Sequence, residues 1–231
     1  MGGRWWKNLL HSSSGAARFG DTRVCALFAL LFLPLVALAQ EWDRNRELLQ
    51  AARSGDEAAV TRLLGRGANL NSRNRLGDTS LNMAAKSGHT GLALLLIERG
   101  ADVNIRNLSG VSPLMSASFN GDARLAKVLL ARGADLTPLD RVKKSAAVYA
   151  AANGHTEVLA MLLDAGVAVN TRYDNDLTVL MWAAAYGRDE TVQLLIRRGA
   201  DLGARDNRGQ TAREMALGGG HPSTVDLLRP R

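Results

Sequence analysis

The feature of this sequence that most constrains its fold is a glycine that returns every 33 residues. Two series of glycines share this period over most of the chain and keep a fixed phase relative to each other. The two series are Gly67, Gly100, Gly133, Gly166 and Gly199, and Gly55, Gly88, Gly121, Gly154, Gly187 and Gly220. A fixed period of this size predicts a tandem array in which one supersecondary unit is repeated along the chain.

Each unit predicts a turn followed by two antiparallel helices. A turn with a glycine, such as 74–77, comes first, and a hydroxyl residue suited to an N-cap follows it. These predicted N-caps are Thr79, Ser112, Ser145, Thr178 and Thr211. A short helix with small residues at its centre comes next. A second, longer helix begins after a polar residue in each unit, at Asp56, His89, Asp122 and His155. This helix ends in an apolar cluster, and a first-series glycine caps it.

The aligned units share the pattern G-x-T-x-L-x-x-A-A-x-x-G-H-x-x-x-x-x-L-L-x-x-G-A-D-V-N, which resembles the ankyrin repeat. The phrases GADVN (100–104), GHTEVLAMLLDAG (154–166) and TVLMWAAAYGRDETVQLLIRRGAD (178–201) carry the resemblance, which spans Asn45 to Leu228. It implies an all-α solenoid of about six helix-turn-helix units with short β-turn fingers, whose fingers and first helices form a concave surface. The expected units are 42–72, 73–105, 106–138, 139–171, 172–204 and 205–231 of a domain over 40–231.

The fourth unit departs from the family's pattern. Lys143 stands where the turn glycine belongs, and Ala146-Ala147 replaces the usual Pro-Leu. We therefore expect this finger to be distorted, or shaped for a ligand. The family's TPLH tetrapeptide occurs only in altered forms, such as TSLN at 79–82, and its histidine is absent from all of them.

The first 39 residues have the three parts of a secretory signal peptide. Four basic residues and one acid precede an uncharged run over 24–37, and small residues follow at Ala37 and Ala39. We predict cleavage between Ala39 and Gln40, and export to the periplasm or secretion. The alternative is an uncleaved membrane anchor, because the run is only slightly shorter than the roughly 17–25 residues of a spanning helix. Pro34 within the run favours cleavage.

Removal of the predicted signal peptide would lower the net charge and take away the single cysteine. The whole chain has 29 Lys and Arg against 22 Asp and Glu, a formal charge of +7, while residues 40–231 carry 25 against 21, or +4. With acids interspersed among the bases, nucleic acid is not an expected partner. The only cysteine, Cys25, lies in the leader. We expect no membrane contact after cleavage, and a monomer.

The sequence has no recognisable constellation for catalysis, a metal or a cofactor. The three histidines after the leader, His89, His155 and His221, share one repeat position. Packed helix layers are about 10 Å apart, so histidines two units apart cannot share a metal ion. The resemblance implies that each imidazole ties successive loops together. Asp174 and Asp176 lack the twelfth-position glutamate of a calcium loop, and we interpret them as a finger tip.

The residues just before the second-series glycines, together with the finger tips, are expected to face the concave surface. There, apolar groups flanked by charge have the composition of a protein-binding patch. The candidate partner-binding residues are Arg75, Leu76, Lys86, Leu108, Val111, Phe119, Arg141, Lys144, Leu177 and Tyr186. The alternative for Phe119 is packing against the next helix. Tyr149 and Trp182, one period apart, are expected to pack.

A row of arginines at one repeat position leaves two interpretations open. Its members are Arg73, Arg106, Arg172 and Arg205, with Leu139 interrupting. The row could favour an acidic partner, or it could be a solvated or locally paired face. The functional hypothesis is a non-catalytic adaptor that binds a protein through its concave face. The alternatives are a membrane-tethered structural component and an accessory to a periplasmic redox enzyme.

Overall fold

The computed structural model describes residues 40–229, and every regular element within that range is a helix. The predicted signal peptide, residues 1–39 including Ala39, lies outside the described residues. None of the described helices combines the length and the apolarity that a membrane crossing needs. Residues 44–231 form one compact unit by themselves, and the repeats lie within it.

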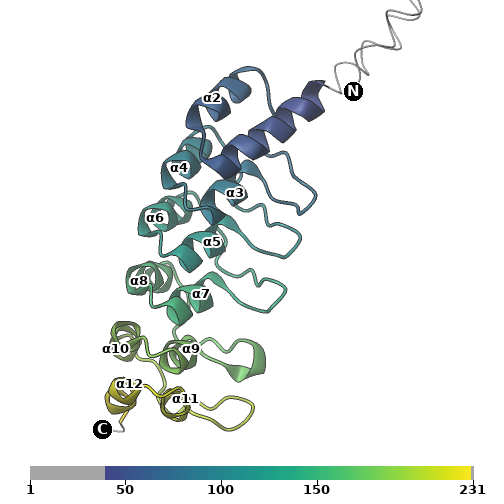
Figure 1. Cartoon of the computed structure of the whole chain (residues 1–231). Helices are drawn as coiled ribbons and strands as arrows, with labels where there is room; N and C mark the ends of the chain where they lie inside the picture. Colours follow the sequence, from purple (N-terminus) through teal and green to yellow (C-terminus); the bar gives the residue numbers. More distant parts are fainter. Residues whose placement is uncertain (1–39, 230–231) are drawn as a thin grey trace, which may run out of the picture. The chain divides into compact units, whose positions relative to one another are not determined.

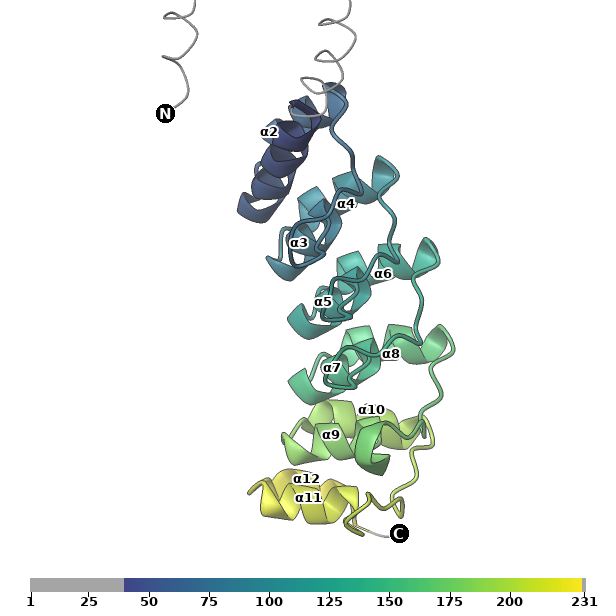
Figure 2. The same ribbon diagram turned by 90° about the vertical axis from the view of Figure 1, so that its right-hand side faces the viewer.

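The helices form two columns, with the fingers extending from the side of the inner column (Figures 1 and 2). A helix that covers residues 40–54 of the described part of the chain and α2 (Glu57–Gly65) supply the pair of repeat 1. The other inner helices are α3 (Ser80–Lys86), α5 (Pro113–Asn120), α7 (Ala146–Asn153), α9 (Val179–Ala185) and α11 (Ala212–Gly218). The other outer helices are α4 (Thr90–Glu98), α6 (Ala123–Ala131), α8 (Thr156–Asp164), α10 (Asp189–Arg197) and α12 (Pro222–Leu227). Each inner helix from α3 onward contacts the next inner helix, and each outer helix from α4 onward contacts the next outer one.

The predicted N-caps of the inner helices are confirmed. The hydroxyl of each accepts a hydrogen bond from the backbone amide three residues later, as in Ser112 with Met115 at 3.2 Å. Thr211 and Glu214 form a capping box, in which the Glu214 carboxylate accepts from the Thr211 amide at 2.7 Å. These bonds satisfy amides that have no partner inside the helix. Each inner helix therefore begins at a position fixed by its own sequence.

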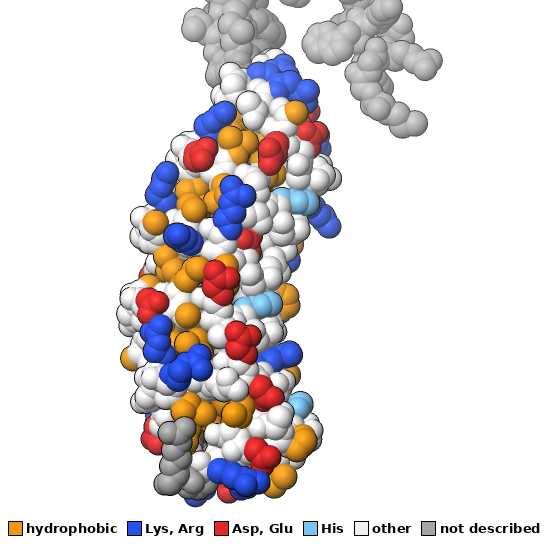
Figure 3. Space-filling view, turned by 90° about the vertical axis from the view of Figure 1, so that its left-hand side faces the viewer, with side chains coloured by type: hydrophobic (Ala, Val, Ile, Leu, Met, Phe, Trp, Pro, Cys, Tyr) orange, Lys and Arg blue, Asp and Glu red, His pale blue; other side chains and the backbone are white. Residues whose placement is uncertain are grey.

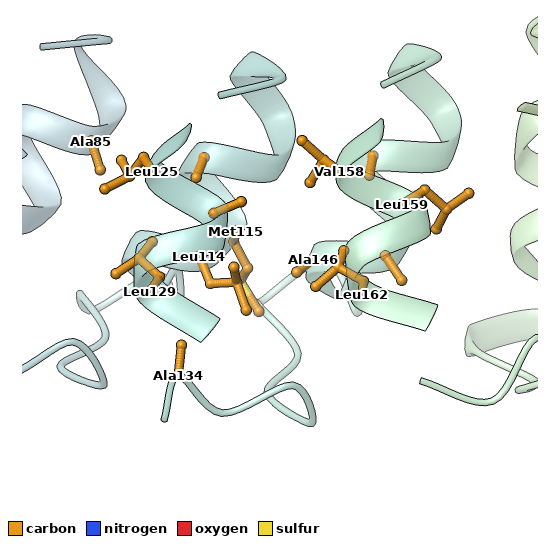
Figure 4. Packing of buried hydrophobic residues seen from close by; sticks show 14 of the residues in the cluster. Ala85, Leu114, Met115, Leu125, Leu129, Ala134, Ala146, Val158, Leu159 and Leu162 are labelled. Carbon is orange, nitrogen blue, oxygen red and sulfur yellow. The ribbon is translucent and has the colours of Figure 1, made fainter. Parts of the chain in front are cut away.

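The core repeats with the same period as the glycines. One outer-helix register is buried leucine in all six repeats, at Leu63, Leu96, Leu129, Leu162, Leu195 and Leu228. The small central residues of the inner helices, such as Ala84 and Ala117, are fully buried, which lets neighbouring inner helices approach closely. Figure 4 shows this packing in repeats 3 and 4, where Leu114 and Met115 of α5 lie near Leu129 of α6. No unit buries its apolar face alone, so the stability of each repeat depends on its neighbours.

The histidine position ties neighbouring repeats together and does not cap its own helix. His89 and His155 stand just before the outer helices, as predicted, and are their N-cap residues, but neither side chain makes a cap hydrogen bond, whereas those of Asp56 and Asp122 do. The Nε2 atom of His155 instead donates to the backbone carbonyl of Phe119, 2.9 Å away in the preceding repeat. His89 and His221 make the equivalent bonds to Arg53 and Ala185, at 3.1 and 3.2 Å. The tie implied by the family resemblance is thus confirmed.

The expectation of a distorted finger in repeat 4 is wrong. Lys143 adopts the left-handed conformation, with φ of 60°, that glycine has in the fingers of repeats 2 and 3. The Asp140 amide donates to the Lys144 carbonyl and the Lys143 amide to the Asp140 carbonyl, both at 3.0 Å. Asn74 and Gly77 make the same two bonds in repeat 2. The hydrogen bonds of the turn outweigh the strain of a lysine at positive φ, which is about 1–2 kcal/mol.

Candidate protein-binding surface

The ends of the inner helices and the finger tips together form what we call the inner surface. Most of the residues predicted to bind a partner are exposed on it. They are Arg75, Leu76, Lys86, Leu108, Phe119, Arg141 and Tyr186. Phe119 and Tyr186 remain 55% and 49% exposed although they are large and apolar. Phe119 also contacts the next inner helix, through the ring of Tyr149, so the alternative of packing there holds in part, but about half of the side chain stays exposed.

Two predicted surface residues, Val111 and Leu177, are half-buried and pack against the core. They occupy the same repeat position as Lys144, which is also half-buried. The apolar side chains at this position pack against the core, whereas the longer lysine places its ammonium group over the rings of Tyr149 and Trp182. Lys144 is thus the only one of the three that brings a charge to the inner surface.

Four aromatic rings and one lysine meet across repeats 3, 4 and 5, and we call this set the aromatic–lysine cluster. The Lys144 Nζ atom lies 4.7 Å from the ring centroid of Trp182 and 5.7 Å from that of Tyr149. Tyr149 in turn meets Phe119 edge to face, with 5.7 Å between centroids. Trp182 stacks on Tyr186, with 6.2 Å between centroids and 7° between planes. Both ring pairs have favoured aromatic geometries, and both lysine contacts lie within cation–π distance.

Hydrogen bonds from the next repeat fix the backbone at the end of α5 that carries the Phe119 ring. The Phe119 carbonyl accepts from His155 Nε2 and from Asn153 Nδ2, each at 2.9 Å. Both donors belong to the next repeat, so the helix end that carries Phe119 is fixed by its neighbour. An exposed ring on a fixed backbone needs little further ordering when it binds a partner.

A buried carboxylate holds Lys144 and Tyr149 together from behind the cluster. Asp140 is 7% exposed, and its Oδ1 accepts from the backbone amides of Val142 and Lys144, both at 2.9 Å. The Tyr149 hydroxyl donates to Oδ2 of the same carboxylate. Burial raises the pKa of Tyr149, and the hydrogen bond to Asp140 raises this pKa further. Tyr149 therefore stays a neutral donor well into the alkaline range.

The arginine row is largely committed to local contacts. Arg73 and Arg172 each donate to the backbone carbonyl of the next row position, Arg106 and Arg205 respectively. Arg205 donates to the Gly209 carbonyl at 2.5 Å. The interpretation as a locally paired face is thus confirmed for these three members, because their guanidinium groups already hydrogen bond within the array.

A surface pocket of about 600 Å³ lies at the fingers of repeats 3 and 4 and brings the predicted residues Leu108 and Arg141 together. Arg73, Arg106 and Leu139 also line it. Over residues 40–229, no set of three histidine, cysteine, aspartate or glutamate side chains is arranged to hold a metal ion.

A family model described as ankyrin repeats in three copies matches residues 48–140, 120–206 and 147–230. The chain belongs to the ankyrin repeat family. Among solved structures, the human ASB11 ankyrin repeat domain is 30% identical, with a TM-score of 0.72, and the match covers 78% of this chain and 81% of that one. An ankyrin repeat domain from Acinetobacter baumannii AYE is 31% identical, with a TM-score of 0.70 and coverage of 78% and 95%. The ankyrin repeat protein EF0377 is 29% identical, with a TM-score of 0.72 and coverage of 80% and 96%. A search of curated proteins gave no match.

Ankyrin repeats are generally protein–protein interaction modules. In this ankyrin array, repeat alignment alone did not reveal the whole cluster. Tyr149 and Trp182 were expected only to pack, and they are half-buried against the core, but their rings also hold Lys144. The signal that could have found them is a lysine at 144, just before the N-cap of α7 and five residues before Tyr149, combined with an aromatic residue, Trp182, at the Tyr149 position of the next repeat.

Proposed function

We propose that this ankyrin array is a non-catalytic adaptor that binds a protein partner through its inner surface, centred on the aromatic–lysine cluster. The observation that carries the proposal is the exposure of Phe119 and Tyr186 at the two ends of a row of contacting side chains. Tyrosine, tryptophan and other aromatics are enriched among the residues that contribute most to protein–protein binding. Exposed apolar groups held on a rigid scaffold gain binding energy with little entropic cost.

The experiment is affinity purification from the native envelope fraction with the wild-type chain and with Phe119→Ala and Tyr186→Ala variants. Loss of a central aromatic anchor costs about 2 kcal/mol or more of binding free energy, so we expect either variant to recover much less partner. Leu217→Ala is the matched control for the cluster, because Leu217 is an apolar residue 65% exposed at the end of α11 on the same inner surface but in the last repeat, outside the cluster, so its loss should reduce recovery less. Unchanged recovery with both aromatic variants, with folding intact by circular dichroism, would refute this surface. A redox enzyme among the partners would favour the accessory role.

We also propose that the protein is exported to the periplasm or secreted, with residues 1–39 removed. The support is the basic, apolar and small-residue order of the leader. Mass spectrometry of the native protein tests it. A mature N-terminus at Gln40 is the expected result, and an intact leader would instead support the membrane-tethered alternative.

A further inference from the structure

The finger tips and inner-helix ends of repeats 2 to 4 are basic. Arg75, Lys86 and Arg141 are exposed there, and Lys144 presents its ammonium group from the cluster. Four aspartates lie in the segments that join the outer helices of repeats 1 to 3 to the next inner helices. Asp102 and Asp135 are exposed near the outer helices, and each accepts a hydrogen bond from the backbone amide two residues later. The other two lie in the finger turns. Asp78 is 4% exposed and accepts from Asn107 Nδ2 at 2.8 Å, and Asp140 is 7% exposed and bound as described above. The two finger-turn aspartates are therefore buried beside Arg75, Arg141 and Lys144, which are the charges that these turns present to solvent.

The opposite side of the array has no such imbalance. Across the outer helices, acidic and basic side chains are interspersed (Figure 3). Exposed acids on these helices include Glu57, Glu98 and Glu157. The excess of basic side chains is therefore a feature of the inner surface and is not spread evenly over the array.

Lys144 differs from the other basic residues of this surface because its environment is partly dehydrated. Among the described residues, no carboxylate forms an ion pair with its ammonium group, which is instead held over the rings of Tyr149 and Trp182. An ammonium group has three donors, and the ring faces do not supply an oxygen acceptor for them. A carboxylate that reached Lys144 would form a charge-assisted hydrogen bond beside apolar rings, where such bonds are stronger than in open water.

We propose that the partner binds as an acidic protein segment, with a carboxylate on Lys144 and an apolar side chain against Phe119 or Tyr186. The array sets the direction of this segment. Its acidic part lies along repeats 2 to 4, because the finger tip of repeat 5 carries the exposed acids Asp174 and Asp176, which would repel it. The inference rests on the proposed function and adds the chemistry of the partner to it.

The test uses random 12-residue peptides displayed on phage, selected on the purified protein and then synthesised. We expect the selected peptides to carry more Asp and Glu than Lys and Arg, and to bind more weakly as NaCl is raised. Lys144→Met keeps the aliphatic stem over Trp182 and removes the charge. It should weaken binding by about ten-fold or more, the loss expected for one charge-assisted hydrogen bond. Lys127→Met, on the exposed face of α6, is the matched control and should leave binding unchanged.

A double-mutant cycle separates a direct contact from a long-range effect. A peptide in which the essential Asp or Glu is changed to Asn or Gln should lose affinity for the wild-type chain. It should lose little further affinity for Lys144→Met, because the same contact is already absent. Additive losses would overturn the assignment of the carboxylate to Lys144.

Other outcomes distinguish this inference from the proposed function. Selected peptides that are neutral or basic, yet lose binding with Phe119→Ala and Tyr186→Ala, would overturn the acidic chemistry and leave the binding surface intact. Peptides insensitive to both the aromatic and the lysine variants would overturn both proposals. A single-stranded DNA oligonucleotide or phosphatidylglycerol vesicles that displaced the peptides at equal concentration would overturn a protein partner in favour of a polyanion.

Discussion

Tyr149→Phe tests whether the buried Asp140 carboxylate organises the cluster. The substitution removes one hydroxyl and leaves the ring that contacts Phe119 and Lys144 in place. Asp140 then loses its Oδ2 donor while keeping the two backbone amides on Oδ1. A hydrogen bond to a charged group contributes about 1.5–3 kcal/mol. Because two of the three donors remain, we expect the low end, a loss of about 1.5 kcal/mol in the free energy of unfolding.

The measurement is urea unfolding followed by circular dichroism and by tryptophan fluorescence, since repeat arrays do not always unfold in one step. Tyr186→Phe is the control. The Tyr186 hydroxyl makes no hydrogen bond to another described residue, so its removal should change stability by less than about 0.5 kcal/mol. If Tyr149→Phe unfolds with the wild-type midpoint, then Asp140 does not depend on the tyrosine and our account of the cluster is wrong.

The raised pKa of Tyr149 adds a pH dependence to the same experiment. The folded chain keeps the phenol proton at pH values where the unfolded chain, with the ordinary pKa near 10.0, releases it. The contribution of Tyr149 to the free energy of unfolding is therefore complete below pH of about 10 and is lost as the pH rises further. Burial also raises the pKa of Tyr173, so this residue too stabilises the fold below pH of about 10 and loses that effect as the pH rises. Tyr149→Phe should make stability fall less steeply above pH 10 than it does in the wild type.

Four further substitutions, of which Gly133→Ala is the control for Gly121→Ala, test the backbone and the core by urea unfolding. Gly121→Ala places a Cβ against the His155 ring at Nδ1, at φ of +71°, whereas Gly133→Ala, at φ of +77°, meets nothing within 4 Å. Both should lose about 1–2 kcal/mol to strain, and Gly121→Ala about 1 kcal/mol more if His155 is displaced. Equal losses of stability in the two variants would contradict the close approach of His155 to Gly121. Lys143→Gly should gain up to about 1 kcal/mol, and a loss would show that the lysine at positive φ is not strained. Leu129→Ala should lose about 2–5 kcal/mol, and a smaller loss would mean that the register is not tightly packed.

The parts of this fold that sequence predicts well are those decided within one repeat. Ser112 caps α5 through an amide three residues away, so the residue itself determines where the helix begins. The hydrogen bond of His155 crosses 36 residues, but it recurs with the repeat and follows from the family pattern. The expectation for the repeat 4 finger failed because it considered only the residue at position 143. The carboxylate of Asp140 and the backbone bonds of the turn hold that residue in a glycine conformation.

The candidate surface was harder to predict because its contacts join positions that the repeat does not make equivalent. Phe119 lies 67 residues before Tyr186, one residue more than two periods, so alignment of the units places them in different columns. They become ends of one cluster only because Tyr149 and Trp182 bridge the intervening repeat through Lys144. Repeat symmetry predicts the contacts that recur in every unit and are needed to stack the array. Contacts that occur once, such as these, are not required for stacking, and that is why they are the place to look for a partner.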